Sequence, residues 1–489
     1  MTWQTWLLPT YSFEAQALYR MCYAVILFAQ LAMTAVSARR FFTSEAYGGY
    51  VQASPLRNRL YHPRIVFTLC ALWLGCTLAL FFDRSTFIAA LLNYGLCRFL
   101  LIDTRWVSLS RGFGAVGHIT LWTAGATAIL ELTRLIDHGG LLRSAALLTF
   151  RVDLGLIMIV AGFYKVTAGY ARGNGWEIAL ANPWWSYWAN TFAKFPPRSI
   201  FFSGMNHMAY IVEIGAGICM LTPLHFFGAI AIAASFVMLG LTLRLTFLPE
   251  MVVVSTLLFI DPGSAADRFV QTLIHQTAQT PVEHGFPGAV ALIIAIALWL
   301  SIPLGVLVRA ALLYNFYRRK RVPGLQAIVD ALASWLLITL WRVFTADIIE
   351  FYIEVYLEGP QGLRSLYSRQ RFLDFERGLR YAHAGEFVAL CTTFTALKYF
   401  SHEPAIFEQR LLRYARTLPV EPGGRVVFRF IRIAKALTFT YTPVADFLVD
   451  PRVGTITEQQ LSAEDDVRRT APGSPIFRGS RVGSYAPPK

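Results

Sequence analysis

The chain has 489 residues, of which 55% are hydrophobic and 14% aromatic, while only 15% are charged. Soluble domains carry about 25% charged residues, so this composition excludes an ordinary soluble protein. Apolar runs long enough to cross a bilayer recur through about the first 350 residues, which predicts a polytopic membrane protein.

The formal net charge is +14. In a membrane protein such a charge is typical of cytoplasmic loops that contact anionic lipid headgroups, so we expect the bilayer as a partner and no nucleic acid. No metal-ligand spacing or phosphate-binding glycine loop occurs, and the six cysteines form no CxxC pair. The sequence therefore predicts no metal site and no disulfide framework.

The predicted membrane spans are apolar segments of roughly helical membrane length. They lie near 18–38, 65–82, 86–102, 113–133, 151–165, 207–223, 226–245, 248–261, 288–314 and 327–346. The segment 248–261 is short, so the prediction is nine or ten spans. The Trp- and Pro-rich stretch WWSYW to KFPPR, between 184 and 198, is predicted to be a re-entrant or interfacial loop.

Basic residues give the predicted orientation. Five of them surround the end of the span 288–314, namely Arg309, Arg318, Arg319, Lys320 and Arg321. The link after the first span is also strongly basic. By the positive-inside rule both ends should be cytoplasmic, which puts the N-terminus outside.

The character of the chain changes after residue 346. Residues 351–357 and 425–433 alternate as strands do, and 380–400 and 404–417 have helical spacing. We therefore expect an all-α membrane domain over 1–346, with about nine to ten transmembrane helices. A small α/β appendage over 347–459 and a disordered basic tail over 460–489 should follow.

Four charged residues interrupt the apolar segments. Arg151, Asp153 and Lys165 share one predicted helix, and Glu213 lies in another. A charge at membrane depth costs about 2.5–3.5 kcal/mol on insertion scales, so these side chains should satisfy one another in a polar cluster. The alternatives are an ion-pair network that only fixes helix packing, or a Lys165 that reaches the interface.

If the cluster lines a pocket, Lys165 is the candidate catalytic base. Burial against an apolar wall disfavours an ammonium group, which converts a lysine into a usable base for a lipophilic substrate. Arg151, Asp153 and Glu213 would then tune its reactivity.

The residues around this lysine resemble the HTTM domain, the membrane domain that vitamin K-dependent gamma-carboxylases share with many bacterial proteins. The similarity rests on Arg151-x13-Lys165, on Ala161-Gly162 before the lysine, and on Tyr170-x-x-Gly173 after it. Further similarity lies in FLLIDTRW (99–106), in Ala216-Gly217 after Glu213, and in WRVF (341–344). The resemblance covers roughly residues 15 to 360.

The resemblance implies that Lys165 is the base that deprotonates a reduced, vitamin K-like quinone. It also implies that Ala161, Gly162, Tyr170 and Gly173 belong to the cofactor-binding segment, and that the lysine faces the bacterial exterior. The charge distribution instead places the loop after Lys165 inside, and one miscounted span would reconcile the two.

Two segments depart from the family. Val107-Ser108-Leu109 stands where the carboxylases have Asn-Asn-His, and SFVMLGLTL (235–243) stands where they have His-x-x-Asn. Their large lumenal domain is replaced by the short appendage. Glutamate carboxylation is therefore not expected.

Three functions remain open from the sequence. The first is a quinone-linked enzyme or peptide-maturation factor of the bacterial inner membrane. The second is a non-catalytic membrane subunit that docks a partner protein or anionic lipid. The third is a transporter, although no broken helices occur in matching halves of the chain.

Overall fold

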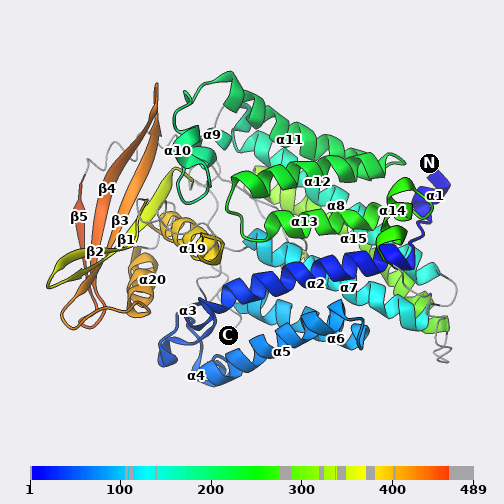
Figure 1. Cartoon of the computed structure of the whole chain (residues 1–489), viewed down its shortest axis with the longest axis horizontal. Coiled ribbons are helices and arrows are strands. Elements are labelled where there is room, and N and C mark those ends of the chain that lie inside the picture. Colours follow the sequence, from blue (N-terminus) through cyan, green and yellow to red (C-terminus); the bar gives the residue numbers. More distant parts are fainter. Residues whose placement is uncertain are drawn as a thin grey trace.

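The structure is a computed structural model that describes residues 3–104, 108, 114–137, 140–172, 175–274, 288–318, 324–335, 338, 349–369, 380–399 and 404–461. Most of the described chain is helical, and its strands form one sheet near the C-terminus. Figure 1 shows the long helices side by side, with the sheet beyond one end of them.

The N-terminal half contains five long helices and several short ones. The long helices are α2 (Phe13–Ala35), α5 (Pro63–Phe81), α6 (Thr86–Cys97), α7 (Gly114–Ile136) and α8 (Leu141–Thr167). The short ones are α1 (Trp3–Leu7), α3 (Ala38–Phe42) and α4 (Pro55–Asn58), and α6 continues as a π-helix over Arg98–Asp103. Helix α2 begins where the Ser12 side chain accepts a hydrogen bond from the backbone N–H of Ala15, an ordinary N-cap.

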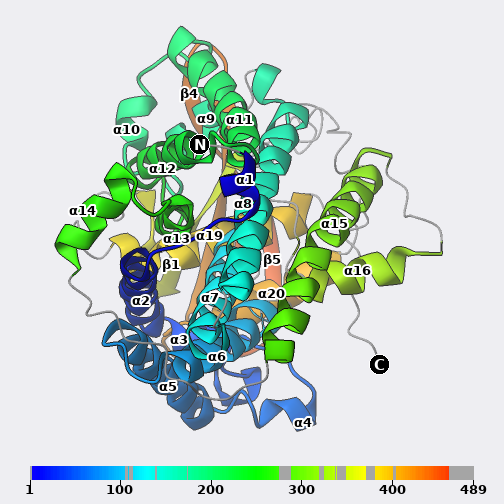
Figure 2. The same cartoon turned by 90° about the vertical axis from the view of Figure 1, so that its right-hand side faces the viewer.

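The second half continues with α9 (Trp176–Ala181), α10 (Ala189–Phe192), α11 (Ile200–Met220), α12 (His225–Thr242), α13 (Leu248–Thr256), α14 (Ala265–Leu273), α15 (Gly288–Arg318) and α16 (Gln326–Trp335). Helix α15 packs against α8. Figure 2 shows α15 and α16 at the edge of the bundle.

Seven helices in the described part of the chain are long and apolar enough to cross a membrane. The finding rests on length and composition, and it supports a multi-pass membrane protein. Helix α11 is 21 residues long but carries Asn206, His207 and Glu213, and it is not among the seven. Helix α13 has nine residues, which is too short to cross, and the predicted span 327–346 is described only in part, with a ten-residue α16.

The C-terminal region is a five-stranded antiparallel sheet with two helices. Its strands are β1 (Phe351–Gly359), β2 (Gly362–Tyr367), β3 (Arg425–Lys435), β4 (Phe439–Asp450) and β5 (Thr455–Gln460), in the order β2-β1-β3-β4-β5. Helices α19 (Arg380–Tyr399) and α20 (Pro404–Arg416) accompany it. Phe394 and Phe407 of these helices contact Phe428, Phe430 and Phe447 of the sheet and form its apolar core.

The sheet is joined to the helical bundle by the segment after α9. Strand β1 pairs with β2 only from Val355 onward, so the edge of its first half is left without a neighbouring strand. The Asn182 side chain donates there to the backbone oxygens of Ile349 and Phe351 (2.8 and 3.2 Å), and the Trp184 indole donates to Ile353 O (2.8 Å). These bonds satisfy backbone acceptors that β2 does not reach.

The structure confirms the predicted strands at 351–357 and 425–433 and the predicted helices at 380–400 and 404–417. Over 184–198, where a re-entrant or interfacial loop was predicted, the structure has only the four-residue helix α10. Strands β2, β4 and β5 were not predicted, and β5 runs to the first residue of the expected tail. The predicted tail beyond 461, the basic residues 319–321, the WRVF motif and Gly173 lie outside the described residues.

Candidate functional site

Helices α8 and α11 pack closely because glycines face each other along their contact. A Cβ added at Gly162 would lie 2.6 Å from Ile214 Cγ1 and 3.1 Å from the backbone oxygen of Tyr210. A Cβ added at Gly217 would lie 2.8 Å from the backbone oxygen of Gly155. Small residues at such contacts let two membrane helices approach backbone to backbone.

The close contact brings Lys165, in the last turn of α8, against Glu213 in the middle of α11. The lysine ammonium donates a hydrogen bond to Glu213 Oε1, and the two groups form an ion pair. Only 7% of Lys165 and 5% of Glu213 are exposed. The lysine is therefore held away from bulk water, with the carboxylate as its ionic partner.

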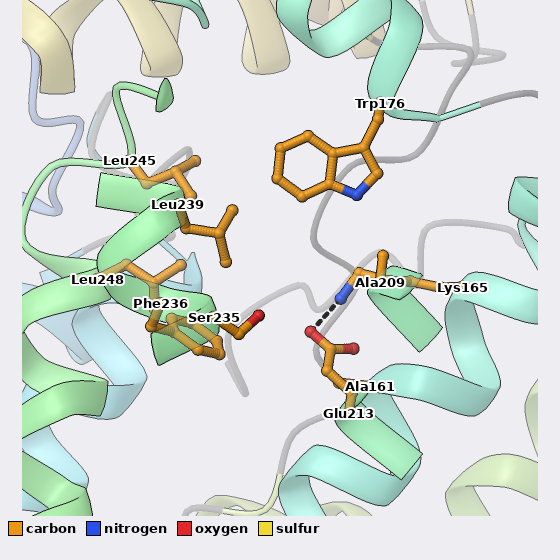
Figure 3. A pocket seen from close by; sticks show the side chains of 10 residues that line it. All are labelled: Ala161, Lys165, Trp176, Ala209, Glu213, Ser235, Phe236, Leu239, Leu245 and Leu248. Carbon is orange, nitrogen blue, oxygen red and sulfur yellow. Dashed lines mark hydrogen bonds and ion pairs between the residues drawn. The ribbon is translucent and has the colours of Figure 1, made fainter. Parts of the chain in front are cut away.

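The pair lies at the edge of a cavity, which we call the chamber. It is lined by Ala161, Lys165, Trp176, Ala209, Glu213, Ser235, Phe236, Leu239, Leu245 and Leu248. Figure 3 shows the Trp176 ring on one side and the apolar side chains of α12 and α13 on the other. The Ser235 hydroxyl points toward the ion pair in this view. The chamber thus has one polar end and apolar walls.

The chamber is small. Its volume is about 20 Å³, which is room for about one water molecule, since about 10–15 Å³ is the minimum that a water needs. Sites for small organic molecules measure about 300–1,000 Å³. The side chains around the chamber suit a lipophilic molecule with a polar oxygen, but a quinone ring system does not fit the chamber in this conformation.

Arg151 and Asp153 do not join Lys165, so the prediction of one four-residue cluster is wrong. Arg151 lies 14 residues before Lys165, and a helix rises about 1.5 Å per residue, so the two are about 21 Å apart along α8. The Arg151 guanidinium is fully buried and binds Leu258 O (2.7 Å) and Asp261 (3.1 Å), whose other oxygen bonds to His225 (2.8 Å).

Asp153 forms a third, separate pair. One of its carboxylate oxygens lies 2.7 Å from the Arg309 guanidinium of α15, and the other accepts a hydrogen bond from the Trp122 indole of α7 (2.9 Å). This pair ties the peripheral helix α15 to the bundle. The chamber therefore holds two of the four predicted catalytic residues, Lys165 and Glu213.

The four residues assigned to a cofactor have different surroundings. Ala161 lines the chamber. At Gly162, atoms of α11 occupy the space that a side chain would need. Tyr170 is buried, and its ring lies 2.9 Å from the position that a Cβ on Gly175 would take. Gly173 is outside the described residues.

Comparisons of the chain with protein-family models, with curated proteins and with solved structures give no match. The resemblance to the HTTM domain therefore stays a hypothesis that rests on the sequence motifs.

The sequence prediction missed the wall residues Trp176 and Ser235. Trp176 stands in an aromatic-rich stretch, where an interfacial role is the common explanation. Ser235 begins the segment SFVMLGLTL, where the family pattern concerns a histidine and an asparagine and no serine. A signal did exist, because a serine in an otherwise apolar span costs free energy unless it has a polar environment.

Proposed function

We propose that this protein is a multi-pass membrane protein that takes up a small lipophilic molecule with a polar oxygen head beside the Lys165–Glu213 pair. The observation that supports the proposal most strongly is the adjacency of this buried ion pair to a chamber with apolar walls. Charged groups at membrane depth usually serve a substrate or proton path. The chamber has room for about one water molecule in this conformation, so the helices must separate to admit such a molecule.

The pair can move a proton. The Lys165 ammonium can donate a hydrogen bond to a carbonyl or hydroxyl oxygen, and the Glu213 carboxylate can accept a proton from it. Glu213 Oε2 is buried and makes no hydrogen bond to the described residues, so it has an acceptor position to offer. Because the lysine is paired, the free-base role expected from the sequence requires that it first pass a proton to Glu213. A reduced quinone is one candidate of this chemical class, but no reaction step is assigned to it.

The test is purification from native membranes followed by mass spectrometry of the bound small molecules. The parent protein should retain a lipophilic compound that Lys165→Met and Glu213→Gln lose. Asp153→Asn is the matched control, because it also alters a buried ion pair on α8 but lies away from the chamber. Equal retention by all variants, or no retained compound in the parent, would refute the proposal.

A second function is favoured by the small volume of the chamber. In this function the chain is a non-catalytic membrane subunit, and the ion pair only fixes the packing of α8 against α11. Replacing both charges by apolar residues, as in Lys165→Met/Glu213→Leu, should then leave assembly and cellular function intact. Loss of function in a stably folded double variant would exclude this alternative.

We also propose that the sheet lies on the cytoplasmic side. The link between α2 and α5, together with the first turn of α5, carries five arginines, namely Arg39, Arg40, Arg57, Arg59 and Arg64. That link contacts the sheet region through Arg40–Glu386 and through Arg413–Gln52 (2.7 Å). At the opposite ends of the helices, acidic residues such as Asp83 and Asp261 are paired with arginines. Basic excess marks the cytoplasmic side.

The orientation can be tested at Val453, which is 73% exposed in the turn between β4 and β5. A Val453→Cys variant should resist a membrane-impermeant maleimide in intact cells and react with it in inverted vesicles. The opposite pattern would place the sheet outside, as the resemblance to the HTTM domain implies for Lys165.

A further inference from the structure

A second buried carboxylate lies between the chamber and the sheet. Glu177 is the second residue of α9 and is fully buried. It accepts hydrogen bonds from the backbone N–H of Gly175 (3.1 Å), from Asn206 Nδ2 of α11 (2.8 Å) and from Lys435 Nζ of β3 (2.8 Å). A buried carboxylate is tolerated only with such partners, because its desolvation is costly.

Lys435 comes from a distant part of the chain. It is the last residue of β3, 258 residues after Glu177, and a quarter of its side chain is exposed. Its ammonium forms an ion pair with the Glu177 carboxylate, so the sheet contributes a charged group to the polar contacts of α9. The Tyr441 hydroxyl of β4 donates to the backbone oxygen of Ala181 (2.8 Å) at the other end of α9.

One of the partners of Glu177, Asn206, also binds a residue of the chamber wall. Asn206 donates to Glu177 with its Nδ2 and accepts, at Oδ1, a hydrogen bond from the backbone N–H of Trp176 (2.8 Å). Trp176 is the first residue of α9, is 4% exposed, and lines the chamber beside Lys165. Lys435, Glu177, Asn206 and Trp176 therefore form one continuous set of contacts from the sheet to the chamber. Figure 3 shows Trp176 at the chamber wall.

We infer that Lys435 is a positioning residue for the chamber: through Glu177 and Asn206, the sheet holds Trp176 in place and keeps the chamber closed. Without Lys435, the buried carboxylate of Glu177 lacks its charge partner, so it draws in water. Helix α9 then moves, and Trp176 at its start leaves its place in the chamber wall. The use of the chamber rests on the proposed function, but the coupling between sheet and chamber does not.

The experiment measures access to the chamber without any ligand. An Ala161→Cys variant of the full chain places a thiol in the chamber wall at a position that is only 2% exposed, and N-ethylmaleimide reports how often that wall opens. The rate of modification at position 161 is read by peptide mass spectrometry, which separates it from the six native cysteines. Adding Lys435→Met should raise this rate about tenfold or more, which corresponds to about 1.4 kcal/mol in the opening equilibrium.

Two further variants separate positioning from general loosening of the sheet. Lys435→Arg keeps the charge and should restore a rate near that of the parent. Arg429→Gln removes another ion pair from the same strand, Arg429–Asp446 (2.8 Å), which does not contact α9, and it should leave the rate unchanged. An unchanged rate in Lys435→Met, or an equal rise in Arg429→Gln, would overturn the inference.

The outcome is independent of the proposed function. If Lys435→Met opens the chamber but purified parent protein retains no lipophilic molecule, the coupling stands and the proposed function fails. If the parent retains such a molecule and Lys435→Met does not change the modification rate, the proposed function stands and the coupling fails.

Discussion

Helix α8 carries two buried basic residues that are each paired with an acid, but their surroundings differ. In the last turn, Lys165 meets Glu213 beside the chamber, against the apolar side chains of α12 and α13. In the middle of the helix, Arg151 is in contact with Leu258 O, with Asp261 and with the ring of Phe259, whose centroid lies 5.5 Å from the guanidinium carbon. The same helix thus presents one ion pair beside a cavity and one bound by backbone and side-chain acceptors.

The two pairs differ in what surrounds their carboxylates. Asp261 has two partners, Arg151 and His225, and is 21% exposed, so both of its oxygens are satisfied, while Arg151 Nη2 has no hydrogen-bond partner among the described residues. Glu213 is less exposed and keeps one oxygen without a hydrogen bond to the described residues. An unused acceptor beside a cavity is the feature that marks the Lys165 end as the candidate site.

The largest expected effect follows from breaking the Lys165–Glu213 pair. Lys165→Met leaves a buried carboxylate without its charge partner, which typically costs about 3–5 kcal/mol. The midpoint of thermal unfolding in detergent should fall accordingly. The double variant Lys165→Met/Glu213→Leu should recover most of this loss, because it leaves no uncompensated charge. A single variant as stable as the parent would contradict this account of the pair.

Breaking the Arg151–Asp261 pair should cost less. In Arg151→Met, Asp261 keeps His225 and some solvent, so the main loss is the unpaired oxygen of Leu258, which costs at most about 3 kcal/mol. The same unfolding measurement should place Arg151→Met between the parent and Lys165→Met. If Arg151→Met is the less stable of the two variants, the contrast between the two pairs is reversed.

A smaller effect is expected from the glycines that bring α8 and α11 together. Gly217→Ala forces a methyl group to within 2.8 Å of the Gly155 oxygen and should cost about 1–2 kcal/mol, at the lower end of overpacking effects. Gly215→Ala on the same helix is the control, since no atom lies within 4 Å of its Cβ position. Equal unfolding midpoints for the two variants would show that the contact tolerates a methyl group.

Local patterns predicted much of the fold. Hydrophobic runs placed α2, α5, α6, α7, α12 and α15, and alternation placed β1 and β3, because these signals depend on short stretches of chain. Strand β4 was missed because the period-2 pattern in FTYTPVADFLVD is interrupted by Pro443, where its register with β3 shifts. Strand β5, TITEQQ, is a polar edge strand without an apolar face to reveal it.

The candidate site was half predictable. That Lys165 and Glu213 share one polar cluster followed from the rule that buried charges need partners. The rule could not choose among partners, because Lys165, Arg151 and Asp153 each face a different helix or loop. Their partners are Glu213 on α11, Asp261 after α13, and Arg309 on α15. Only the arrangement of the helices decides that choice. The role of Lys435 could not be predicted from the sequence, because it depends on a contact with Glu177, 258 residues earlier in the chain.

The smallest expected effect concerns a carboxylate outside the membrane, which provides the reference for the buried ones. Asp450 is exposed and accepts hydrogen bonds from the backbone N–H groups of Arg452 (2.9 Å) and Val453 (3.0 Å), and these bonds lower its pKa below its usual value. A carboxyl group whose pKa is lower in the folded state stabilises the fold above its unfolded pKa of about 3.9. The stabilisation is lost as the pH falls through the folded pKa.

Asp450→Asn keeps an acceptor but no charge, so it should unfold slightly more easily than the parent at pH 7. The two midpoints should converge as the pH falls through the lowered pKa of Asp450, below which the carboxyl of the parent is also neutral. A difference that persists at that pH would mean that the carboxylate charge is not what stabilises this turn.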